Sequence, residues 1–281
     1  MKIVNSKAEL QALLSNAKGH KSIGLTPTMG NLHSGHLKLV DAAVEECDVV
    51  VCSIFVNPTQ FGPDEDLANY PRTLEADKQK LNSANCDILF LPTVAEMYSD
   101  DLNGETTIHV PGVSANYCGQ SRPGHFDGVA TIVCKLLNIV QPTVSYFGLK
   151  DYQQFLVINK LVDDLRLPVK VVGIETERES SGLAKSSRNN YLDSNQKDLA
   201  AGLYSTLQWA AGQIQIPLCN FIAIEESATN RLNQLGLTVD YFSICHSNSL
   251  RPASQKDSEL TILAAVFLGK TRLIDNIHVR L

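Results

Sequence analysis

Strand-like and helix-like segments alternate through the first part of the chain. Nearly continuous apolar, β-branched runs indicate buried strands, and apolar positions that recur every three or four residues indicate amphipathic helices. The expected strands are residues 21–28, 48–56, 87–92, 143–148 and 169–176. The expected helices are residues 37–47, 73–84, 127–140 and 153–166. Alternation of this kind predicts an α/β fold with a doubly wound parallel, Rossmann-like sheet.

The pattern changes after about residue 180. A polar loop, residues 179–190, is followed by two helical stretches, about 195–215 and 220–235. Three strand-like runs then follow without helices between them: residues 239–246, 260–269 and 272–279. We therefore expect a second, smaller α+β domain with an antiparallel sheet. The predicted domains are residues 1–176 and residues 177–281, and the second carries the sequence SSRN.

Composition narrows the class of protein. The 281 residues are 44% hydrophobic and 19% charged, which is typical of a soluble globular protein with an ample core. The net charge of −6 disfavours nucleic acid or a membrane surface as a partner. The N-terminus lacks the apolar region of a signal peptide, and the seven cysteines include no CxxC pair. We expect a cytoplasmic protein whose cysteines are small buried hydrophobic residues.

A histidine motif follows the first expected strand. Residues 27–36 read PTMGNLHSGH, and a helical pattern begins directly after them. Ligands of open parallel sheets bind at the carboxyl ends of strands, where helix N-termini suit phosphate. At this place His33 and His36 can donate hydrogen bonds to phosphoryl oxygens, and the intervening Gly35 permits close backbone approach.

Other interpretations of this motif remain open. One histidine can cap a turn while the other packs in the core. A histidine pair can also bind zinc, although no third ligand is evident nearby. Neither a P-loop nor a GxGxxG fingerprint is present, so the usual phosphate-binding loops are excluded.

A series of motifs extends over nearly the whole chain. In order they are PTMGNLHSGH (27–36), SIFVNPTQF (53–61), YPRT (70–73), SRPGHFDGV (121–129), FGLKDYQQ (147–154), GLAKSSRN (182–189) and RLIDN (272–276). HxGH alone resembles the nucleotidylyltransferase superfamily, and the full series resembles the pantothenate synthetase family of pantoate–β-alanine ligases. The resemblance implies that pantoate and ATP form pantoyl adenylate and pyrophosphate, after which β-alanine displaces AMP. It also implies Mg²⁺ and a homodimer.

The resemblance assigns roles residue by residue. It implies that His33, His36, Lys150 and Arg188 are catalytic, with the second histidine as the acid, and that Met29, Asn57, Gln60 and Gln154 bind pantoate or β-alanine. The implied ATP-binding residues are Met29, Gly30, Asn31, Leu32, His33, Ser34, Gly35, His36, Gly148, Leu149, Lys150, Asp151, Glu177, Lys185, Ser186, Ser187 and Arg188. Asp151 would orient Lys150 or help to hold Mg²⁺. Residues 186–188 resemble a mobile phosphate-binding loop, and we expect His125 to form a structural turn.

Several positions depart from the family pattern. Leu149 stands where Glu or Gln is usual, Lys185 replaces an apolar residue, and Cys118 replaces a usual Glu. Glu175 and Glu177 fall in a segment that is mostly apolar in relatives. We expect these departures to change KM for ATP more than the type of reaction.

Two rival functions remain. The chain can be a nucleotidyltransferase that keeps the adenylyl group on its product, or a non-catalytic nucleotide-binding protein. A requirement for β-alanine separates the first rival from a ligase. We also expect residues of both domains to form the active site, which would close when ATP binds.

Overall fold

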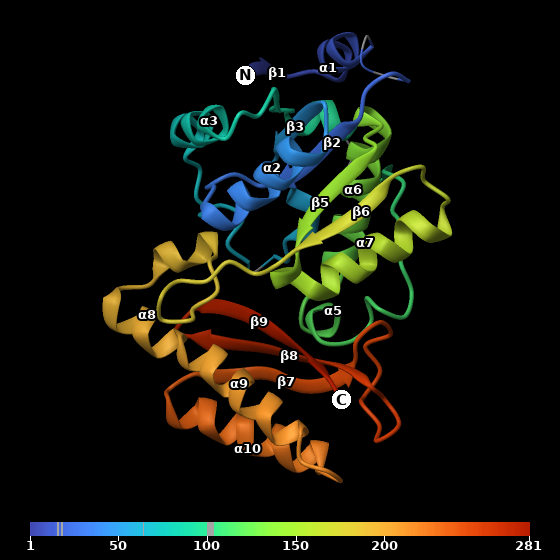
Figure 1. Cartoon of the computed structure of the whole chain (residues 1–281). Coiled ribbons are helices and arrows are strands. Elements are labelled where there is room, and N and C mark those ends of the chain that lie inside the picture. The colour runs from blue at the N-terminus through green and yellow to red at the C-terminus, as the bar shows by residue number, and fades with distance from the viewer. Residues whose placement is uncertain (16, 18, 64, 100–103) are drawn as a thin grey trace. The chain divides into compact units, whose positions relative to one another are not determined.

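A parallel sheet of six strands forms the centre of the N-terminal part of the chain in the computed structural model (Figure 1). The structure describes residues 1–15, 17, 19–63, 65–99 and 104–281. The strands are β1 (Lys2–Val4), β2 (Ile23–Thr28), β3 (Val49–Ile54), β4 (Ile88–Phe90), β5 (Val144–Gly148) and β6 (Lys170–Ile174). Their order is β1-β4-β3-β2-β5-β6, and every neighbouring pair is parallel. Each strand expected in this region is present. The short β1 has no counterpart among the predictions, because three residues show no periodicity.

The two faces of this sheet are covered by different helices. One core joins α1 (Lys7–Leu14), α4 (Val94–Met97), α6 (His125–Val140) and α7 (Tyr152–Asp164) to one side of the strands. The other core joins α2 (Ser34–Glu46) and α3 (Leu74–Ser83) to the opposite side. Val51 of β3 lies in the first core, and its neighbours Val50 and Cys52 lie in the second. Burial on both faces explains the nearly continuous apolar sequence of this strand.

The histidine motif begins where the strand order reverses. β2 pairs with β3 on one side and with β5 on the other. The chain continues from β2 through α2 to β3, whereas β5 enters the sheet later from the opposite side. This is the topological switch point, where open α/β sheets bind ligands beyond the carboxyl ends of their strands. The segments after β2, β3 and β5 therefore meet at one edge of the sheet.

The C-terminal part of the chain contains an antiparallel sheet of three strands. β7 (Thr238–His246), β8 (Glu259–Leu268) and β9 (Thr271–Arg280) follow one another in the sheet. The helices α9 (Gly202–Ile214) and α10 (Phe221–Gln234) share one apolar core with these strands. The predicted fold class, a Rossmann-like sheet with a smaller α+β domain, is confirmed.

One predicted helix in this part is wrong. The single helix expected over residues 195–215 is two helices, α8 (Ser194–Ala200) and α9, with a break at Ala201. Gly202 follows the break and lies against Leu235, the residue after α10 (Phe221–Gln234), since a Cβ atom there would be 2.5 Å from Leu235 Cδ1. Glycine permits this close approach and has a low helix propensity, which the periodicity of the apolar positions does not reveal.

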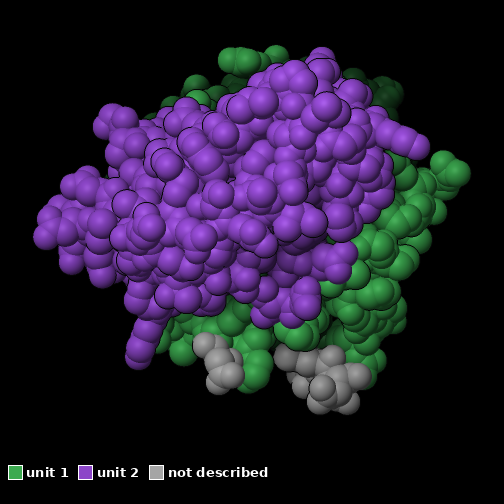
Figure 2. Space-filling view, turned by 90° about the horizontal axis from the view of Figure 1, so that it is seen from below, with its two compact units in different colours: residues 1–115, 122–149, 154–175 green, residues 116–121, 150–153, 176–281 purple. Residues whose placement is uncertain are grey.

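The described chain divides into two compact units, coloured separately in Figure 2. The first unit comprises residues 1–115, 122–149 and 154–175. The second comprises residues 116–121, 150–153 and 176–281. The short helix α5 (Cys118–Ser121) and residues 150–153 therefore belong with the antiparallel sheet, although they lie far from it in the sequence.

Candidate active site

The two motif histidines lie in the first turn of α2, directly after β2. His33 is the N-cap residue, with φ −126° and ψ 174°, and His36 is the third residue of the helix. Their ring centroids are 4.0 Å apart. The backbone N–H of His33 donates a hydrogen bond of 3.3 Å to Nδ1 of His36. Because Nδ1 accepts, the ring proton of His36 lies on Nε2, where it is a hydrogen-bond donor.

The same turn offers further polar groups. The first N–H groups of a helix have no carbonyl partner within the helix and carry a positive partial charge. The hydroxyl oxygen of Ser34 is buried and has no hydrogen-bond partner among the described residues. The start of α2 therefore presents N–H groups, a hydroxyl and an imidazole donor, which together suit an anion.

Three of the predicted pantoate-binding residues lie together in the first unit. Nε2 of Gln60 is 3.1 Å from Sδ of Met29, and Oε1 of Gln60 accepts a hydrogen bond of 3.1 Å from Nδ2 of Asn57. Asn57 is buried, and its Oδ1 accepts a hydrogen bond of 2.8 Å from the hydroxyl of Tyr98. Met29 follows β2, and Asn57 and Gln60 follow β3, and these residues meet because β2 and β3 are parallel neighbours in the sheet. The remaining member, Gln154, lies in the first turn of α7.

The N-terminus of α6 fixes the segment that carries Gln60. Nδ1 of His125 lies 2.8 Å from the carbonyl oxygen of Gln60, and its Nε2 lies 2.9 Å from Nη1 of Arg122. An arginine only donates, so Nε2 accepts and Nδ1–H donates to the carbonyl. Gly128 permits close contact here, because a Cβ atom would lie 2.4 Å from the carbonyl oxygen of Thr59.

Arg122 is in turn held by a carboxylate. Its Nε and Nη2 lie 2.6 and 2.7 Å from the two carboxylate oxygens of Glu65. Burial alone would raise the pKa of Glu65, but the hydrogen bonds and charge of Arg122 outweigh burial and hold this pKa below its ordinary value. The chain Glu65–Arg122–His125 thus ends on the backbone of Gln60. We infer that this network positions Gln60, in keeping with the structural role expected of His125.

Lys150 and Asp151 lie in a short 3₁₀ helix, η3 (Leu149–Asp151), after Gly148 at the end of β5. Nζ of Lys150 is 3.8 Å from Oδ2 of Asp151. This distance is too long for a hydrogen bond, so the ammonium keeps donors for another anion. Nδ2 of Asn276 donates a hydrogen bond of 2.9 Å to the carbonyl oxygen of Lys150, which fixes the backbone of Lys150 to β9.

The predicted phosphate loop begins with a closed backbone turn. The N–H of Lys185 donates a hydrogen bond of 2.8 Å to the carbonyl oxygen of Glu177, so these two residues are paired at the base of the loop. Ser186 caps η4 (Ser187–Tyr191) by accepting a hydrogen bond of 3.2 Å from the N–H of Arg188. The side chain of Ser187 lies in a buried position. The structure thus brings Glu177, Lys185 and residues 186–188 together within the second unit.

A buried ion pair anchors this loop to β9. Nη1 and Nη2 of Arg178 lie 2.6 and 2.9 Å from the two carboxylate oxygens of Asp275. The guanidinium also lies 3.6 Å from the ring centroid of Tyr204. Burial raises the pKa of Asp275, and the guanidinium of Arg178 opposes this. The paired geometry satisfies both carboxylate oxygens, as a buried charge requires.

Cys118, one of the expected departures from the family pattern, lies in α5 beside a positive charge. Its sulfur is 3.5 Å from Nη2 of Arg272 and 3.0 Å from the hydroxyl of Tyr241. Burial, with the contribution of Cys118, raises the pKa of Tyr241. Nη2 of Arg272 lies 2.7 Å from Oδ2 of Asp240. Asp240 therefore balances the charge of Arg272 in this chain.

The networks include charged residues that were not among the predicted site residues, such as Arg178 and Asp275. Asp77, whose carboxylate accepts hydrogen bonds from the N–H groups of Asn31 and Leu32, was not predicted either. Asp275 belongs to the motif RLIDN, and Asp77 follows YPRT by four residues. In β9 the alternating positions 273, 277 and 279 are apolar, and a charged residue at position 275 of the same alternation is a usable signal, because a buried charge needs a partner. Its partner Arg178 lies 97 positions away, which sequence spacing does not reveal.

Metal and membrane signals are weak in the described part of the chain. Among the residues that the structure describes, no three or more His, Cys, Asp or Glu side chains are grouped so as to hold a metal ion. No described helix is both long and apolar enough to cross a lipid bilayer.

Comparisons with known proteins agree with the geometry. Residues 2–278 match the family model described as pantoate-beta-alanine ligase. The chain is 54% identical to pantothenate synthetase of Pseudomonas aeruginosa strain UCBPP-PA14, with all of both chains covered. Identity to pantothenate synthetase of Idiomarina loihiensis is 52%, covering 99% of this chain and 98% of the relative.

Solved structures give the same family. The crystal structure of pantothenate synthetase from Thermus thermophilus matches with a TM-score of 0.92 at 42% identity, covering 99% of each chain. Pantoate-beta-alanine ligase from Francisella tularensis, complexed with beta-gamma ATP and beta-alanine, matches with a TM-score of 0.83 at 35% identity, covering 99% of this chain and 97% of that one. A family match over nearly the whole length, in a fold that places the HxGH motif at the switch point of the sheet, identifies the chain as a member of the pantoate–beta-alanine ligase family.

Proposed function

We propose that the protein condenses pantoate with β-alanine to give pantothenate, with ATP cleaved to AMP and pyrophosphate. In the first step a carboxylate oxygen of pantoate attacks the α-phosphorus of ATP, so that pantoyl adenylate forms and pyrophosphate leaves. In the second step the amine of β-alanine attacks the acyl carbon, loses a proton and displaces AMP. Activation is needed because a free carboxylate is a poor electrophile. Membership of the family, and the nucleotide and β-alanine named in the Francisella complex, support this proposal.

The position and tautomer of His36 are the observation that supports the adenylation step most directly. Nδ1 of His36 accepts from the backbone, so its ring proton lies on Nε2, the type of donor that a phosphoryl oxygen accepts from. His36 lies in the first turn of a helix at the switch point of the sheet, where the helix dipole also favours an anion. We assign to His36 and His33 the stabilisation of charge on the phosphorus as the α-phosphate is attacked.

Gln60, with Met29 and Asn57, is assigned to pantoate. The amide N–H of Gln60 points at the thioether of Met29, which is a weak acceptor. A hydroxyl or carboxylate oxygen of pantoate can replace that partner at little cost. Gln154 supplies a second neutral amide. Neutral amides hold the carboxylate without pairing so tightly that it loses nucleophilicity.

The phosphate groups of ATP are assigned to residues of the second unit. Lys150 acts as a point charge whose ammonium is not hydrogen-bonded to Asp151. Ser186, Ser187 and Arg188 carry hydroxyls and a guanidinium, the types of donor that a departing pyrophosphate needs.

A site with few protein ligands, such as the one that Asp151 would provide, suits Mg²⁺. This ion keeps several waters and is held by one or two carboxylates together with substrate phosphates. Asp151 supplies such a carboxylate, and 47% of its side chain is exposed. When bound, the ion would neutralise phosphate charge. We assign Asp151 to hold it and to restrain Lys150.

Exchange of labelled pyrophosphate into ATP tests the proposal. Adenylation needs no group of β-alanine, so exchange should occur with pantoate and Mg²⁺ alone and should vanish without pantoate. Gln154→Ala should weaken exchange, since each hydrogen bond lost from a buried polar substrate costs about 1–3 kcal/mol. Exchange that required β-alanine would instead indicate a concerted reaction of three substrates and would contradict the adenylate route.

The rival functions give different outcomes in a product assay. A ligase releases AMP in proportion to pantothenate only when β-alanine is present. A nucleotidyltransferase would accumulate an adenylylated product without β-alanine, and a non-catalytic protein would bind ATP without exchange. The homodimer and the cytoplasmic location stay predictions, and sedimentation of the purified protein tests the former.

A further inference from the structure

Side chains of α3 hold the backbone just before His33. Oδ2 of Asp77 accepts a hydrogen bond of 2.8 Å from the N–H of Asn31, and Oδ1 accepts one of 2.8 Å from the N–H of Leu32. Nζ of Lys80 donates a hydrogen bond of 2.5 Å to the carbonyl oxygen of Leu32. Asp77 and Lys80 are three residues apart on one helix face. Both polar backbone groups of Leu32 are therefore bound by one element.

The held segment has a backbone that needs support. Gly30 and Asn31 both adopt left-handed conformations, with φ of 81° and 48°. A non-glycine residue in this region is uncommon and persists where its surroundings fix it. Two N–H groups from this reversal converge on one carboxylate, so their hydrogen bonds stabilise the turn rather than reaching outward.

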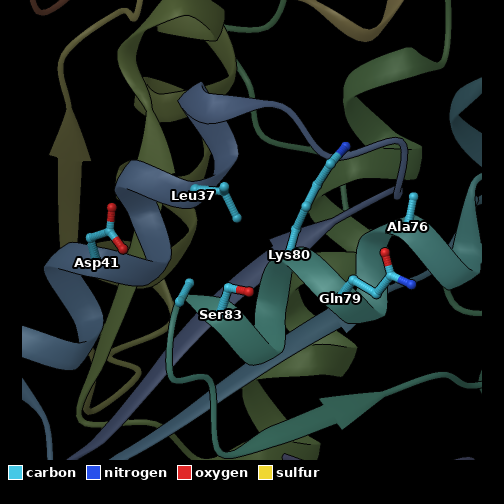
Figure 3. A pocket seen from close by; sticks show the side chains of 7 residues that line it. Leu37, Asp41, Ala76, Gln79, Lys80 and Ser83 are labelled. Atoms are coloured by element: carbon cyan, nitrogen blue, oxygen red, sulfur yellow. The ribbon is translucent and has the colours of Figure 1, made fainter.

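The carboxylate of Asp77 is buried where it binds the turn. Its exposed fraction is 1%, and its Oδ1 also accepts a hydrogen bond of 3.1 Å from the hydroxyl of Thr73. Figure 3 shows Lys80 extending from α3 toward the segment that precedes α2, along an open surface pocket of about 410 Å³. The two side chains thus bind the segment from one face of α3, with Asp77 buried and Lys80 lining the pocket.

We infer that Asp77, assisted by Lys80, is a positioning residue for adenylation. The carboxylate fixes the turn at Asn31 and Leu32, and this turn sets where His33 begins α2 and where Nε2–H of His36 points. Asp77 and Lys80 act through the backbone of this turn and do not touch the substrate. The inference rests on the proposed function, because it concerns the histidines that act in the adenylation step.

Asp77→Asn is the decisive variant. It keeps one acceptor and places an NH₂ group against a backbone N–H, so the turn loses one hydrogen bond and relaxes. We expect kcat of pyrophosphate–ATP exchange to fall about 10–100-fold with little change in KM for pantoate, because small misplacements of reacting groups have costs of this size. Lys80→Met keeps the packing of the aliphatic part of the side chain and loses the hydrogen bond to the carbonyl oxygen of Leu32. We therefore expect kcat of exchange to fall about 3–10-fold.

Asp87→Asn is the matched control. Asp87 also accepts a backbone hydrogen bond, 2.8 Å from the N–H of Val50, but at the amino end of β3 and away from the motif. Exchange by this variant should stay near the wild-type rate. Urea unfolding of all three variants separates a loss of stability from a loss of rate.

Four outcomes would overturn the inference. The first is that Asp77→Asn unfolds at lower urea concentration but keeps the wild-type kcat. The second is that Asp87→Asn loses exchange activity to the same extent as Asp77→Asn. The third is that a higher Mg²⁺ concentration restores exchange in Asp77→Asn, which would mean that the carboxylate of Asp77 binds the metal. The fourth applies if Asp77→Asn does not fold: an unchanged kcat in Lys80→Met would then show that side chains of α3 do not position the motif histidines. Absence of exchange in the wild type would refute the proposed function itself, and this outcome is distinct from the other four.

Discussion

His36 offers a way to separate helix capping from chemistry within one imidazole. His36→Asn keeps an acceptor near the position of Nδ1 for the N–H of His33 and removes the donor at Nε2. We expect kcat to fall about 10²–10³-fold in both His36→Ala and His36→Asn, the loss typical of a donor that stabilises a developing charge. Urea unfolding should barely change in His36→Asn. A near-normal kcat in His36→Asn would show that the imidazole only caps the helix.

Glu65 gives a residue-level prediction about pH. Its folded pKa is lowered, so its stabilising contribution is full above the unfolded value, near 4.5, and is lost as the pH falls through the folded value. Glu65→Gln should therefore lower the free energy of unfolding at pH 7 by about 1–2 kcal/mol, between the values for exposed and buried ion pairs. The difference from wild type should shrink as the pH is lowered below 4.5. A difference that stayed constant with pH would exclude the ion pair as its cause.

At the scale of elements, Arg178 and Asp275 tie the predicted phosphate loop to β9. Removing one partner leaves a buried charge, so we expect Asp275→Asn or Arg178→Met to cost about 3–5 kcal/mol in the free energy of unfolding. The double variant should cost less than the sum of the two single variants, because no unpaired charge remains. Urea denaturation of the four proteins measures this cycle. Additive losses would mean that the pair does not act as a unit.

The elements differ in how well the sequence predicts them. α6 is long and strongly periodic, and β3 is a continuous β-branched run, so the sequence pattern predicts the type of both. β1 has only three residues, and the break at Ala201 precedes a close contact of Gly202 with Leu235, which periodicity does not show. The motif histidines are recognisable because their chemistry and their place after a strand lie within one segment.

The anchors of the site are harder to predict because they connect distant segments. Asp77 contacts residues 45 and 46 positions earlier in the chain, and Arg178 contacts a residue 97 positions later. Only the folded register of strands and helices brings such pairs together. Met29 and Gln60, 31 positions apart, show the favourable case: both follow neighbouring strands, so the predicted sheet already implies that they meet.

At the scale of the whole molecule, each unit has its own apolar core. The proposed ATP ligands are divided between the units, with His33 and His36 in the first and Lys150 and Arg188 in the second. The single tryptophan, Trp209, lies in α9 and packs against the core of the second unit. Its fluorescence therefore reports the unfolding of the second unit.

If residues of both units bind the nucleotide, ATP with Mg²⁺ should stabilise the second unit as well as the first. A ligand that binds only the native state adds about 2.7 kcal/mol at one hundred times its dissociation constant. We expect the urea midpoint seen by Trp209 fluorescence to rise with ATP in parallel with that seen by far-ultraviolet circular dichroism. In Arg188→Ala the rise should shrink, whereas in Arg280→Ala, an exposed position at the end of β9, it should persist. A Trp209 transition that ATP does not move, beside a shifted transition in circular dichroism, would restrict nucleotide binding to the first unit and would remove Lys150 and Arg188 from the proposed site.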